Sequence, residues 1–326
     1  MVRACVTGGA GFIGSGLVDR LSAAGVQVAV LDNLRTGRRE FLDAALARPG
    51  VRFVEGDVLD PAALDDALQG CDWVFHLQAN ADVRDGLKHP RWDLEQNTIA
   101  TAGVLEGMRA HGISRIAFTS TGSIYGEPEV IPTPEDAPFP VQTSLYGASK
   151  AACEGLIAAY AAGYGFTGVI FRLVSILGER YTHGHLIDFY RALKRDPTRL
   201  RVLGDGRQRK SYLYVQDCLD AMLALCERHR DEAGAHIYNL GRDETLTVAE
   251  SVAILCEHLA VAPQVEHTGG ARGWVGDSPH IHLDTARVRA SGWHPRLTIA
   301  QAAVRTLRWL DANEYAWREP AVATWR

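Results

Sequence analysis

The stretch TGGAGFIG, from Thr7 to Gly14, decides the fold that we expect for this chain. It follows a short apolar run at 4–6 that is typical of a buried strand. It precedes apolar residues spaced for one face of a helix, at Leu17, Val18 and Leu21. Its four glycines satisfy both G-x-G-x-x-G and G-x-x-G-x-x-G. Because a strand comes before them and a helix after them, they predict a dinucleotide-binding turn rather than an ordinary glycine turn.

The reason for this pattern is local. Glycines allow the tight turn, let the backbone approach a pyrophosphate and let the helix pack closely on the strand. The N-terminus of the helix then offers free N–H groups and the positive end of its dipole to the phosphates. A second predicted strand, at 26–31, ends in Asp32, 18 positions after Gly14. A carboxylate there can accept hydrogen bonds from the hydroxyls of the adenosine ribose.

The composition is that of an ordinary globular protein. The chain has 326 residues, of which 47% are hydrophobic and 22% charged, so a mainly disordered chain is excluded. The net charge of −5 gives no indication of a nucleic-acid or polybasic membrane surface. The cluster Arg35, Arg38 and Arg39 has two interpretations. It is either a solvated loop or a group at the adenosine end of the cofactor that could tolerate a 2′-phosphate.

Six cysteines lie far apart in the sequence, and none forms a C-x-x-C pair. We interpret them as reduced core thiols of a cytoplasmic protein, and we see no spacing typical of a metal site. Met1 leads directly into the first predicted strand, which leaves no room for a signal peptide. No run of about 18 apolar residues is present, so no membrane span is expected.

Residues 2–171 alternate between strand-like and helix-like segments. We expect strands at 2–6, 27–31, 51–55, 73–76, 114–119 and 167–171, and helices near 12–24, 61–69, 91–111 and 144–163. The alternation predicts an α/β fold of Rossmann type, a doubly wound parallel sheet with helices on both faces. Ligands of such sheets bind beyond the carboxyl ends of the strands, so the loops at these ends are the expected place for chemistry.

The composition changes after about residue 172, where Pro and Gly become frequent, and the predicted helices become shorter. We predict a nucleotide-binding domain from 1–172 plus about 211–241, to which the strand candidates at 212–215 and 236–240 return. Segments at about 173–210 and 242–312 are expected to form a smaller α/β substrate domain. Residues 313–326 have no clear period and are assigned to a C-terminal tail.

Tyr146 and Lys150 lie four positions apart in the segment SLYGASK, which begins at Ser144. On a helix these positions share one face, so the ammonium group can lie near both the phenol and the cofactor ribose. A free tyrosine titrates near ~10, and a nearby cation favours the phenolate. Tyr146 is therefore a candidate general base or acid, although a solvated pair is the ordinary interpretation of such a spacing.

A hydroxyl-rich loop supplies the second part of the candidate site. The predicted strand that ends near Thr119 opens into the sequence STGSIYG, which includes Thr121 and Ser123. A hydroxyl there can hydrogen-bond a hydroxyl or carbonyl of the substrate and pass its proton to Tyr146. The alternative is a capped turn, since Ser and Thr favour such loops in any case.

With these motifs in place, the chain resembles the NAD-dependent sugar-nucleotide epimerase/dehydratase family of extended short-chain dehydrogenases/reductases. It is close in pattern to the UDP-galactose 4-epimerases of that family. The resemblance covers nearly the whole chain. Besides the glycine turn, Tyr146 and Lys150, it includes the sequences DNL at 32–34, GDV at 56–58, HL at 76–77, GDG at 204–206, YVQD at 214–217 and GW at 292–293.

The resemblance implies a role for each matching residue. Thr121, Tyr146 and Lys150 are the expected catalytic residues. The expected NAD-binding residues are Gly8, Gly11, Phe12, Ile13, Asp32, Asn33, Thr36, Gly37, Asp57, Val58, Leu77, Gln78, Ala79, Asn97, Tyr146 and Lys150. The expected substrate-binding residues are Asn80, Thr121, Ser123, Tyr146, Ser175, Lys210 and Arg272, of which Lys210 and Arg272 would hold the diphosphate. No metal ligand is expected.

The resemblance also implies a mechanism, inversion at C4 of a nucleoside-diphosphate sugar through a transient 4-keto sugar. Tyr146 would take the proton of the 4-hydroxyl while NAD⁺ takes hydride, and the hydride would then return to the other face of the sugar. The protein orients the groups, and the cofactor performs the hydride chemistry. Retained NAD and a homodimer are further implications. The dimer would pair the helices near 91–111 and 144–163, where the second helix has an alanine-rich face.

The chain departs from the family pattern at four places. Gly122 and Ser123 follow Thr121, where the 4,6-dehydratases carry Asp-Glu, so dehydration lacks its acid pair. Decarboxylases usually keep a Glu there as well. Ser175 replaces an Asn near the diphosphate, Lys210 replaces an Arg and gives a point charge instead of a two-pronged clamp, and Gln78 replaces a small residue beside the nicotinamide. These changes leave the base and the sugar open.

Two other functions are compatible with the same residues. One is an NAD(P)H-dependent reductase of a 4-keto sugar nucleotide, which the arginine cluster at 35–39 would favour. The other is a non-catalytic regulator that senses NAD or a sugar nucleotide. The intact Thr121, Tyr146 and Lys150 argue against it, because a sensor has no need of them. The loop residues His183 and His185 could contact the sugar, although an exposed loop histidine usually has no such role.

Overall fold

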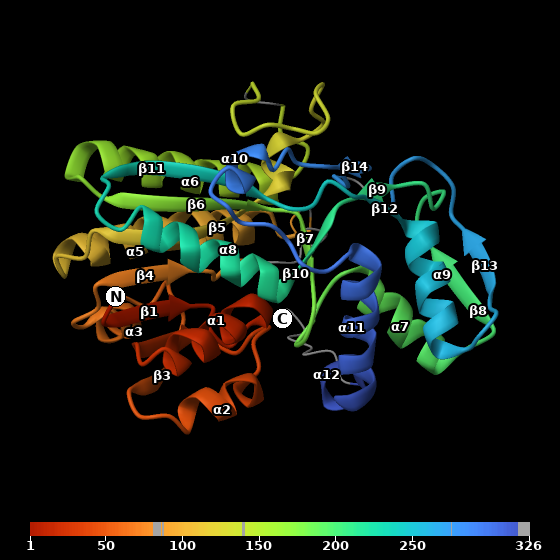
Figure 1. The fold of residues 1–326 in the computed structure, drawn as a ribbon, viewed down its shortest axis with the longest axis horizontal. Helices are drawn as coiled ribbons and strands as arrows, with labels where there is room; N and C mark the ends of the chain where they lie inside the picture. Colours follow the sequence, from red (N-terminus) through yellow and green to blue (C-terminus); the bar gives the residue numbers. More distant parts are fainter. Residues whose placement is uncertain (81–85, 87, 139–140, 275, 319–326) are drawn as a thin grey trace.

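The structure is a computed structural model that describes residues 1–80, 86, 88–138, 141–274 and 276–318 (Figure 1). A large sheet lies at one end of the molecule, and a smaller group of helices and short strands lies at the other. Among the described residues, we find no helix with both the length and the apolar composition that crossing a bilayer requires.

The large sheet has seven strands in the order β11-β6-β5-β4-β1-β2-β3, and all of its pairings are parallel. This order confirms the doubly wound sheet of Rossmann type, with the change of winding direction between β1 and β4. Its strands are β1 (Arg3–Thr7), β2 (Gln27–Asp32), β3 (Val51–Glu55), β4 (Trp73–His76), β5 (Arg115–Thr121), β6 (Thr167–Leu173) and β11 (Gly234–Leu240).

Helices cover both faces of this sheet, because successive side chains of each strand point to opposite faces. In β1, Cys5 belongs to one hydrophobic core and Val6 to the other. The core around Val6 includes apolar residues of α1 (Phe12–Ala23) and α8 (Val215–Arg228). The core around Cys5 includes those of α3 (Pro61–Leu68), α5 (Ala100–Ala110) and α6 (Leu145–Tyr164).

The helix expected at 91–111 is divided into three segments. It begins as α4 (Pro90–Asp93), continues as the π-helical segment η2 (Leu94–Ile99) and ends as α5. A π-helical turn inside an α-helix adds a residue to the turn and is frequent at functional sites. The apolar period alone did not indicate this change of winding.

Three small sheets lie outside the large one in the part of the chain that the structure describes. β7 (Ser175–Leu177) pairs with β10 (Tyr212–Tyr214), β8 (Arg199–Val202) pairs with β13 (Gln264–His267), and β9 (Arg209–Lys210) lies between β12 (Leu246–Thr247) and β14 (His280–Ile281). The strand expected at 212–215 is thus β10, and it pairs with β7 outside the large sheet. The strand expected at 236–240 is β11, which does join it.

Helices α7 (His185–Arg195), α9 (Val248–Leu259), α11 (Ile299–Ala312) and α12 (Tyr315–Arg318) lie beside these small sheets (Figure 1). The short elements that remain are η1 (Arg39–Leu42), α2 (Asp43–Leu46), η3 (Gly122–Tyr125) and α10 (Ala286–Arg289). The division into two domains at the boundaries given above stays a prediction, as does the assignment of a tail, of which 319–326 lies outside the described residues.

Candidate active site

The residues expected to hold cofactor and substrate follow the carboxyl ends of the strands in the large sheet. Gly8 follows β1, Asp32 ends β2, Asp57 follows β3, Leu77 follows β4 and Thr121 ends β5. Because these strands are parallel, their carboxyl ends meet at one edge of the sheet, where the winding change between β1 and β4 opens a crevice in this fold. The topology therefore brings together residues that are far apart in the sequence.

The glycine turn after β1 excludes side chains at two positions. Gly8 has a φ of +70°, and a Cβ there would lie 2.7 Å from the backbone nitrogen of Gln78. A Cβ on Gly14 would lie 2.2 Å from the carbonyl oxygen of Gly8. Gly11 is the N-cap of α1 and has no side chain to cap it, so the first-turn amides near Phe12 and Ile13 can serve an anionic ligand.

Asp32 connects the glycine turn to the end of β2. Its Oδ2 accepts a hydrogen bond from the Ala10 N–H at 2.9 Å, and its Oδ1 accepts one from the Leu34 N–H at 2.9 Å. Burial raises the pKa of this carboxyl, although both backbone donors act in the opposite direction. Each carboxylate oxygen has a second lone pair, which a ribose hydroxyl can use. Thr36 and Gly37 lie in the loop beyond, where a Cβ on Gly37 would lie 2.8 Å from Asp32 Oδ1.

A row of polar side chains runs along this edge from β2 to β4. Asn33 Nδ2 donates to Asp57 Oδ2 at 2.8 Å, and Gln96 Nε2 donates to the same oxygen at 3.3 Å. Gln78 Nε2 donates to Gln96 Oε1 at 2.7 Å. The Oε1 atom of Gln78 is buried and has no hydrogen-bond partner among the described residues. Gln96 is absent from the residues expected above, and only its position beside Asn97 pointed to it.

Asn97 joins the loop after β4 to the helix that carries the candidate base. Its Oδ1 accepts from the Asn80 N–H, and its Nδ2 donates to Ser149 Oγ, both at 2.8 Å. Ser149 Oγ in turn donates to the carbonyl oxygen of Tyr146 at 2.8 Å. The other residues expected near the cofactor are the buried Val58 and the half-buried Leu77 and Ala79.

Thr121 begins η3 as its N-cap. Its Oγ1 accepts a hydrogen bond from the Ser123 N–H at 3.1 Å and donates one to Ser123 Oγ at 3.3 Å. This cap is the turn that the Ser/Thr-rich sequence predicts. It also holds the two hydroxyls next to each other at the carboxyl end of β5, so the turn and a role in substrate binding are compatible.

Lys150 is buried, and its Nζ atom donates to the carbonyl oxygen of Thr119 at 2.9 Å. The same nitrogen lies 4.4 Å from the centre of the Phe118 ring. Burial lowers the pKa of the ammonium to about 8, while the nearby Cys153, Glu154 and Asp93 raise it. The ammonium group thus connects α6 to the end of β5.

Lys150 is not among the groups that shift the pKa of Tyr146 in this structure. Burial raises the pKa of Tyr146, and the charges of Asp93 and Cys153 raise it further. The cause is that the phenol is desolvated beside an acidic group, while the ammonium of Lys150 contacts a backbone carbonyl. Tyr146 is therefore protonated near neutral pH in this structure.

Asp93 is a site residue that the sequence analysis missed. It is 1% exposed, and its Oδ1 accepts hydrogen bonds from Asn80 Nδ2 at 3.0 Å and from Asn97 Nδ2 at 3.4 Å. Its negative charge affects both Tyr146 and Lys150. The available signal was its position four residues before Asn97, which puts both on one helical face.

A second missed residue is Glu154, one helical turn beyond Lys150 on α6. Its Oε1 accepts a hydrogen bond from Ser120 Oγ at 2.5 Å, and Arg172 forms a two-pronged pair with its carboxylate, with Nη2 2.7 Å from Oε2. Arg172 Nη1 also donates to Tyr125 Oη at 2.6 Å. Because Ser120 and Tyr125 flank Thr121, this buried network positions the hydroxyl-rich loop relative to α6.

Both cations expected at the substrate diphosphate form ion pairs within the chain. Lys210 Nζ lies 2.6 Å from Oδ1 of the buried Asp277, and Arg272 pairs with Glu127. Ser175 is exposed at the start of β7. The structure therefore places Lys210 and Arg272 beside carboxylates, with which an incoming diphosphate would compete.

The two loop histidines that could contact a sugar have different surroundings. His183 is exposed, whereas His185 begins α7 and is half-buried, with Nδ1 3.5 Å from Tyr212 Oη. Burial, together with the charge of Lys210, lowers the pKa of His185 to about 4. Its Nε2 atom is buried and lacks a partner among the described residues.

The arginine cluster lies against aromatic rings. The guanidinium carbons of Arg35, Arg38 and Arg39 lie 5.0 Å, 6.0 Å and 5.1 Å from the ring centres of Trp92, Tyr315 and Phe53, respectively. These contacts are cation–π interactions. They hold the arginine cluster against the protein. They do not decide between a solvated loop and a group that tolerates a 2′-phosphate on the cofactor.

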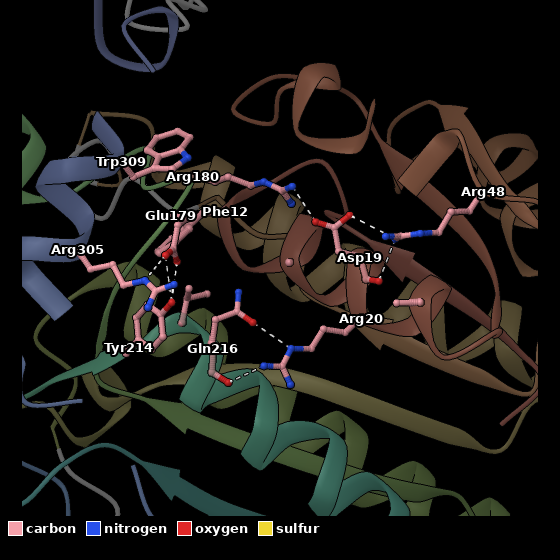
Figure 2. A pocket seen from close by; sticks show the side chains of 13 residues that line it. Phe12, Asp19, Arg20, Arg48, Glu179, Arg180, Tyr214, Gln216, Arg305 and Trp309 are labelled. Carbon is pink, nitrogen blue, oxygen red and sulfur yellow. Dashed lines mark hydrogen bonds and ion pairs between the residues drawn. The ribbon is translucent and has the colours of Figure 1, made fainter. Parts of the chain in front are cut away.

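A groove beside α1 shares only Phe12 with the residues expected above (Figure 2). Its charged groups pair with one another: Arg180 lies 2.7 Å from Asp19, and Arg305 lies 2.5 Å from Glu179, whose carboxylate also accepts from the Tyr214 hydroxyl. The groove therefore has its charges largely compensated within the chain.

The residues at the sheet edge fit a bound dinucleotide. The two glycines leave a space that a Cβ would fill, α1 begins without a side-chain cap, Asp32 lies at the end of β2, and Gln78 has a buried oxygen without a partner among the described residues. Pyrophosphate, ribose hydroxyls and an amide are the groups that these features can bind.

Comparison with known proteins gives a consistent picture. The model of the "NAD dependent epimerase/dehydratase family" matches residues 4–241. UDP-glucose 4-epimerase of Mycolicibacterium smegmatis is 32% identical over 314 residues, which cover 94% of this chain and 97% of that protein.

Two solved structures are similar over nearly the whole chain. The UDP-glucose 4-epimerase of Thermus thermophilus in complex with NAD is 34% identical, with a TM-score of 0.84 over 95% of this chain and 99% of that one. DesIV, a dTDP-glucose 4,6-dehydratase of Streptomyces venezuelae with NAD and TYD bound, is 28% identical, with a TM-score of 0.88 over 98% and 100%.

Proposed function

The chain belongs to the NAD dependent epimerase/dehydratase family, and we propose that it is an epimerase that inverts C4 of a nucleoside-diphosphate sugar. The observation that carries this proposal is that no acid pair follows Thr121. Gly122 and Ser123, the first residues of η3, occupy the positions where the 4,6-dehydratases carry Asp and Glu. The cofactor is NAD, as in the relatives solved with it.

NAD would be held by the glycine turn, by Asp32 and by the row of side chains that includes Asn33, Asp57 and Gln78. When bound, it supplies a hydride acceptor and donor, so that a carbon can be oxidised and reduced again within one turnover. Since this cycle leaves the cofactor as it was, we expect the purified protein to retain it.

The chain's own residues would move the proton. Thr121 would hold the sugar 4-hydroxyl through its Oγ1, and Tyr146 would accept the hydroxyl proton and return it. Lys150 would hold the cofactor ribose and provide positive charge beside the phenol. Because burial raises the pKa of Tyr146 in this structure, positive charge has to approach the phenol before it can act as a base.

Dehydration is disfavoured by the absence of an acid pair in the loop. The sequence of η3 contains no carboxylate. Two acidic residues close to this loop are engaged, Glu154 with Ser120 and Arg172, and Glu127 with Arg272. Water elimination needs a proton donor and a base at the sugar carbons, and these pairs supply neither.

Asn80, Ser123 and Ser175 would contact the sugar and its linkage, while Lys210 and Arg272 would bind the diphosphate. For this, Arg272 would exchange Glu127 for a phosphate, which its exposed position permits. Lys210 stays beside Asp277 and contributes a point charge. The relatives named above act on UDP and dTDP sugars, and the base for this chain is a question for experiment.

The test has two steps. The protein as purified is denatured and its released nucleotides are identified by mass spectrometry, where stoichiometric NAD⁺ is expected. UDP, dTDP, GDP, CDP and ADP sugars are then offered, and proton NMR is used to detect a C4 epimer without net consumption of NAD(H). Net oxidation of NADPH with a 4-keto sugar would instead identify a reductase, and no turnover with any sugar would contradict catalysis of this type.

Tyr146→Phe is the matched variant for this assay. It keeps the ring and removes the hydroxyl, so we expect turnover to fall by about 100- to 10,000-fold. Bound NAD and the melting temperature should change little. A variant that keeps more than a tenth of the turnover would contradict the role of Tyr146 as the proton-transfer group.

A further inference from the structure

Two histidines and a glutamate meet at the end of the molecule opposite to the glycine turn. His229 follows the C-terminus of α8, Glu232 lies in the turn after it, and His236 lies near the amino end of β11 (Figure 1). The cofactor edge of the sheet is formed by the carboxyl ends of its strands, so this group is separate from the site described above. The sequence analysis did not recognise it as a metal site.

The ligand atoms of the three side chains are already close. One ligand atom from each of them lies within 4.8 Å of the others, and His229 Nδ1 lies 2.7 Å from Glu232 Oε2. Two ligand atoms on a tetrahedral zinc ion lie about 3.3 Å apart. A small opening of this pair, with loss of the proton between the two atoms, would therefore admit an ion.

Both imidazoles have an outer partner on the same ring nitrogen. His229 Nε2 lies 2.8 Å from Tyr238 Oη, and His236 Nε2 lies 3.0 Å from the carbonyl oxygen of Glu232. A metal-binding histidine usually donates its second ring nitrogen to such an oxygen, which fixes the tautomer and leaves the other nitrogen for the metal. The Nδ1 atoms are thus the ones left for an ion.

The two imidazole rings differ in burial and lie against each other. His229 is buried, with 7% of its surface exposed. The two rings stack with their centres 3.8 Å apart and their planes 15° apart, so one ring has to turn before both nitrogens can point at one ion. His236 can turn, since it is half-buried and borders solvent.

We infer that His229, Glu232 and His236 bind one divalent transition-metal ion of the zinc type, with water in the remaining position. Two imidazole nitrogens and one carboxylate oxygen suit Zn²⁺, Co²⁺ and Ni²⁺ better than Mg²⁺ or Ca²⁺, which prefer oxygen ligands. The ion would join the end of α8 to the start of β11, and by linkage it would stabilise the folded chain.

The test uses the full chain, treated with a chelator and then titrated with ZnCl₂ or CoCl₂ by calorimetry. We expect saturation at one equivalent, visible absorption bands typical of a nitrogen-bound Co²⁺ site, and a melting temperature that rises with the zinc concentration. MgCl₂ at the same concentration should produce none of these changes.

Variants separate this site from general surface binding. His236→Gln and Glu232→Gln each remove a ligand and should weaken zinc binding by at least about tenfold. Tyr238→Phe removes an outer partner but no ligand, and it should weaken binding by about 10- to 100-fold. The matched control is His111→Gln, because His111 pairs with Asp65 at 2.8 Å in an exposed His–carboxylate contact that has no second histidine among the described residues.

The inference would be overturned if no one-equivalent binding is seen, or if His236→Gln and Glu232→Gln bind zinc as the unmodified chain does. Unchanged affinity in Tyr238→Phe would contradict the assigned tautomer. None of these measurements depends on turnover, so the result is independent of the proposed epimerase activity.

Discussion

The charge of Lys150 depends on the groups around its buried nitrogen. Burial lowers its pKa to about 8, and Cys153, Glu154 and Asp93 act in the opposite direction. An unfolded chain would keep this lysine protonated up to about pH 10.4. As the pH rises between these two values, the folded chain loses the proton of Lys150 before the unfolded chain does. This group therefore makes the folded state more stable at higher pH. Over the same range, the site loses the positive charge that it needs. We therefore expect kcat/KM to fall above about pH 8.

Glu154→Gln tests whether this network controls the charge of Lys150. Removing the carboxylate lowers the pKa of the ammonium, so the basic limb of kcat/KM should move to lower pH by roughly one unit. The measurement is the pH profile of epimerisation, with the cofactor bound.

Two further variants serve this test. Ser120→Ala removes the hydrogen bond from the Ser120 hydroxyl to Glu154 but keeps the charge of Glu154. The basic limb of kcat/KM should therefore stay in place in this variant. Glu154→Asp keeps the carboxylate charge and the ion pair with the buried Arg172, so its basic limb should also stay in place. An unmoved limb in Glu154→Gln would show that Glu154 has only a structural role.

At the scale of elements, the turn between β1 and α1 is the most constrained part of the cofactor site. The sequence analysis predicted this turn, and its reason is visible in the contacts: a Cβ on Gly14 would lie 2.2 Å from a backbone oxygen that cannot move away. The eight predicted strands are all present within two residues of their expected ends, because alternation of apolar runs and turns is encoded locally. The π-helical η2, in which Thr98 donates a hydrogen bond to the Ser149 carbonyl oxygen of α6, was not predicted.

Gly14→Ala should therefore weaken NAD binding. The added methyl group forces the turn apart at a cost of about 1–3 kcal/mol. If that cost falls on the cofactor-bound form, affinity falls by roughly 5- to 150-fold. The measurement is the amount of NAD retained after gel filtration, together with an equilibrium binding titration.

The matched control is Gly163→Ala on α6, where a Cβ would meet no atom within 4 Å. Alanine favours a helix over glycine, so this variant should retain NAD and be slightly more stable. Equal retention of NAD by both variants would contradict the role assigned to the turn.

At the scale of the whole molecule, the outer side of η2 and α6 is apolar and uncovered. Leu94 and Ile99 are each 51% exposed, and Ala152 and Ala159 of the alanine-rich face are exposed as well, although Ala161 is buried against the chain's own core. Single exposed apolar residues are ordinary, but several together on neighbouring helices are typical of an interface. This supports the proposal of a homodimer through these helices.

Light scattering tests this proposal. A dimer has twice the 35.6 kDa mass of the chain, about 71 kDa. Ile99→Glu places a charge in the proposed interface and should give the monomer mass, because an unpaired charge is costly to bury there. Val265→Glu, at an exposed apolar residue of β13, should leave the dimer unchanged. A monomer mass for the unmodified chain would contradict the dimer.

The sequence alone determined the class of fold, the glycine turn and the family. These features depend on neighbours in the chain: apolar period, turn glycines and the four-residue spacing of Tyr146 and Lys150. The expected site residues lie at one end of the sheet for the same reason, since the carboxyl ends of parallel strands meet at one edge. Residues such as Asp93 and Glu154 were missed because nothing in their local sequence sets them apart from surface carboxylates.

Only the tertiary structure decided the charge of these groups and their partners. Lys210 pairs with Asp277, which is 67 positions away, and Arg272 pairs with Glu127, which is 145 positions away. The pKa of Tyr146 is raised by burial and by the charges of Asp93 and Cys153, while the ammonium of Lys150 contacts a backbone carbonyl. Desolvation and Coulomb energy depend on distances through space, and a linear spacing does not contain them.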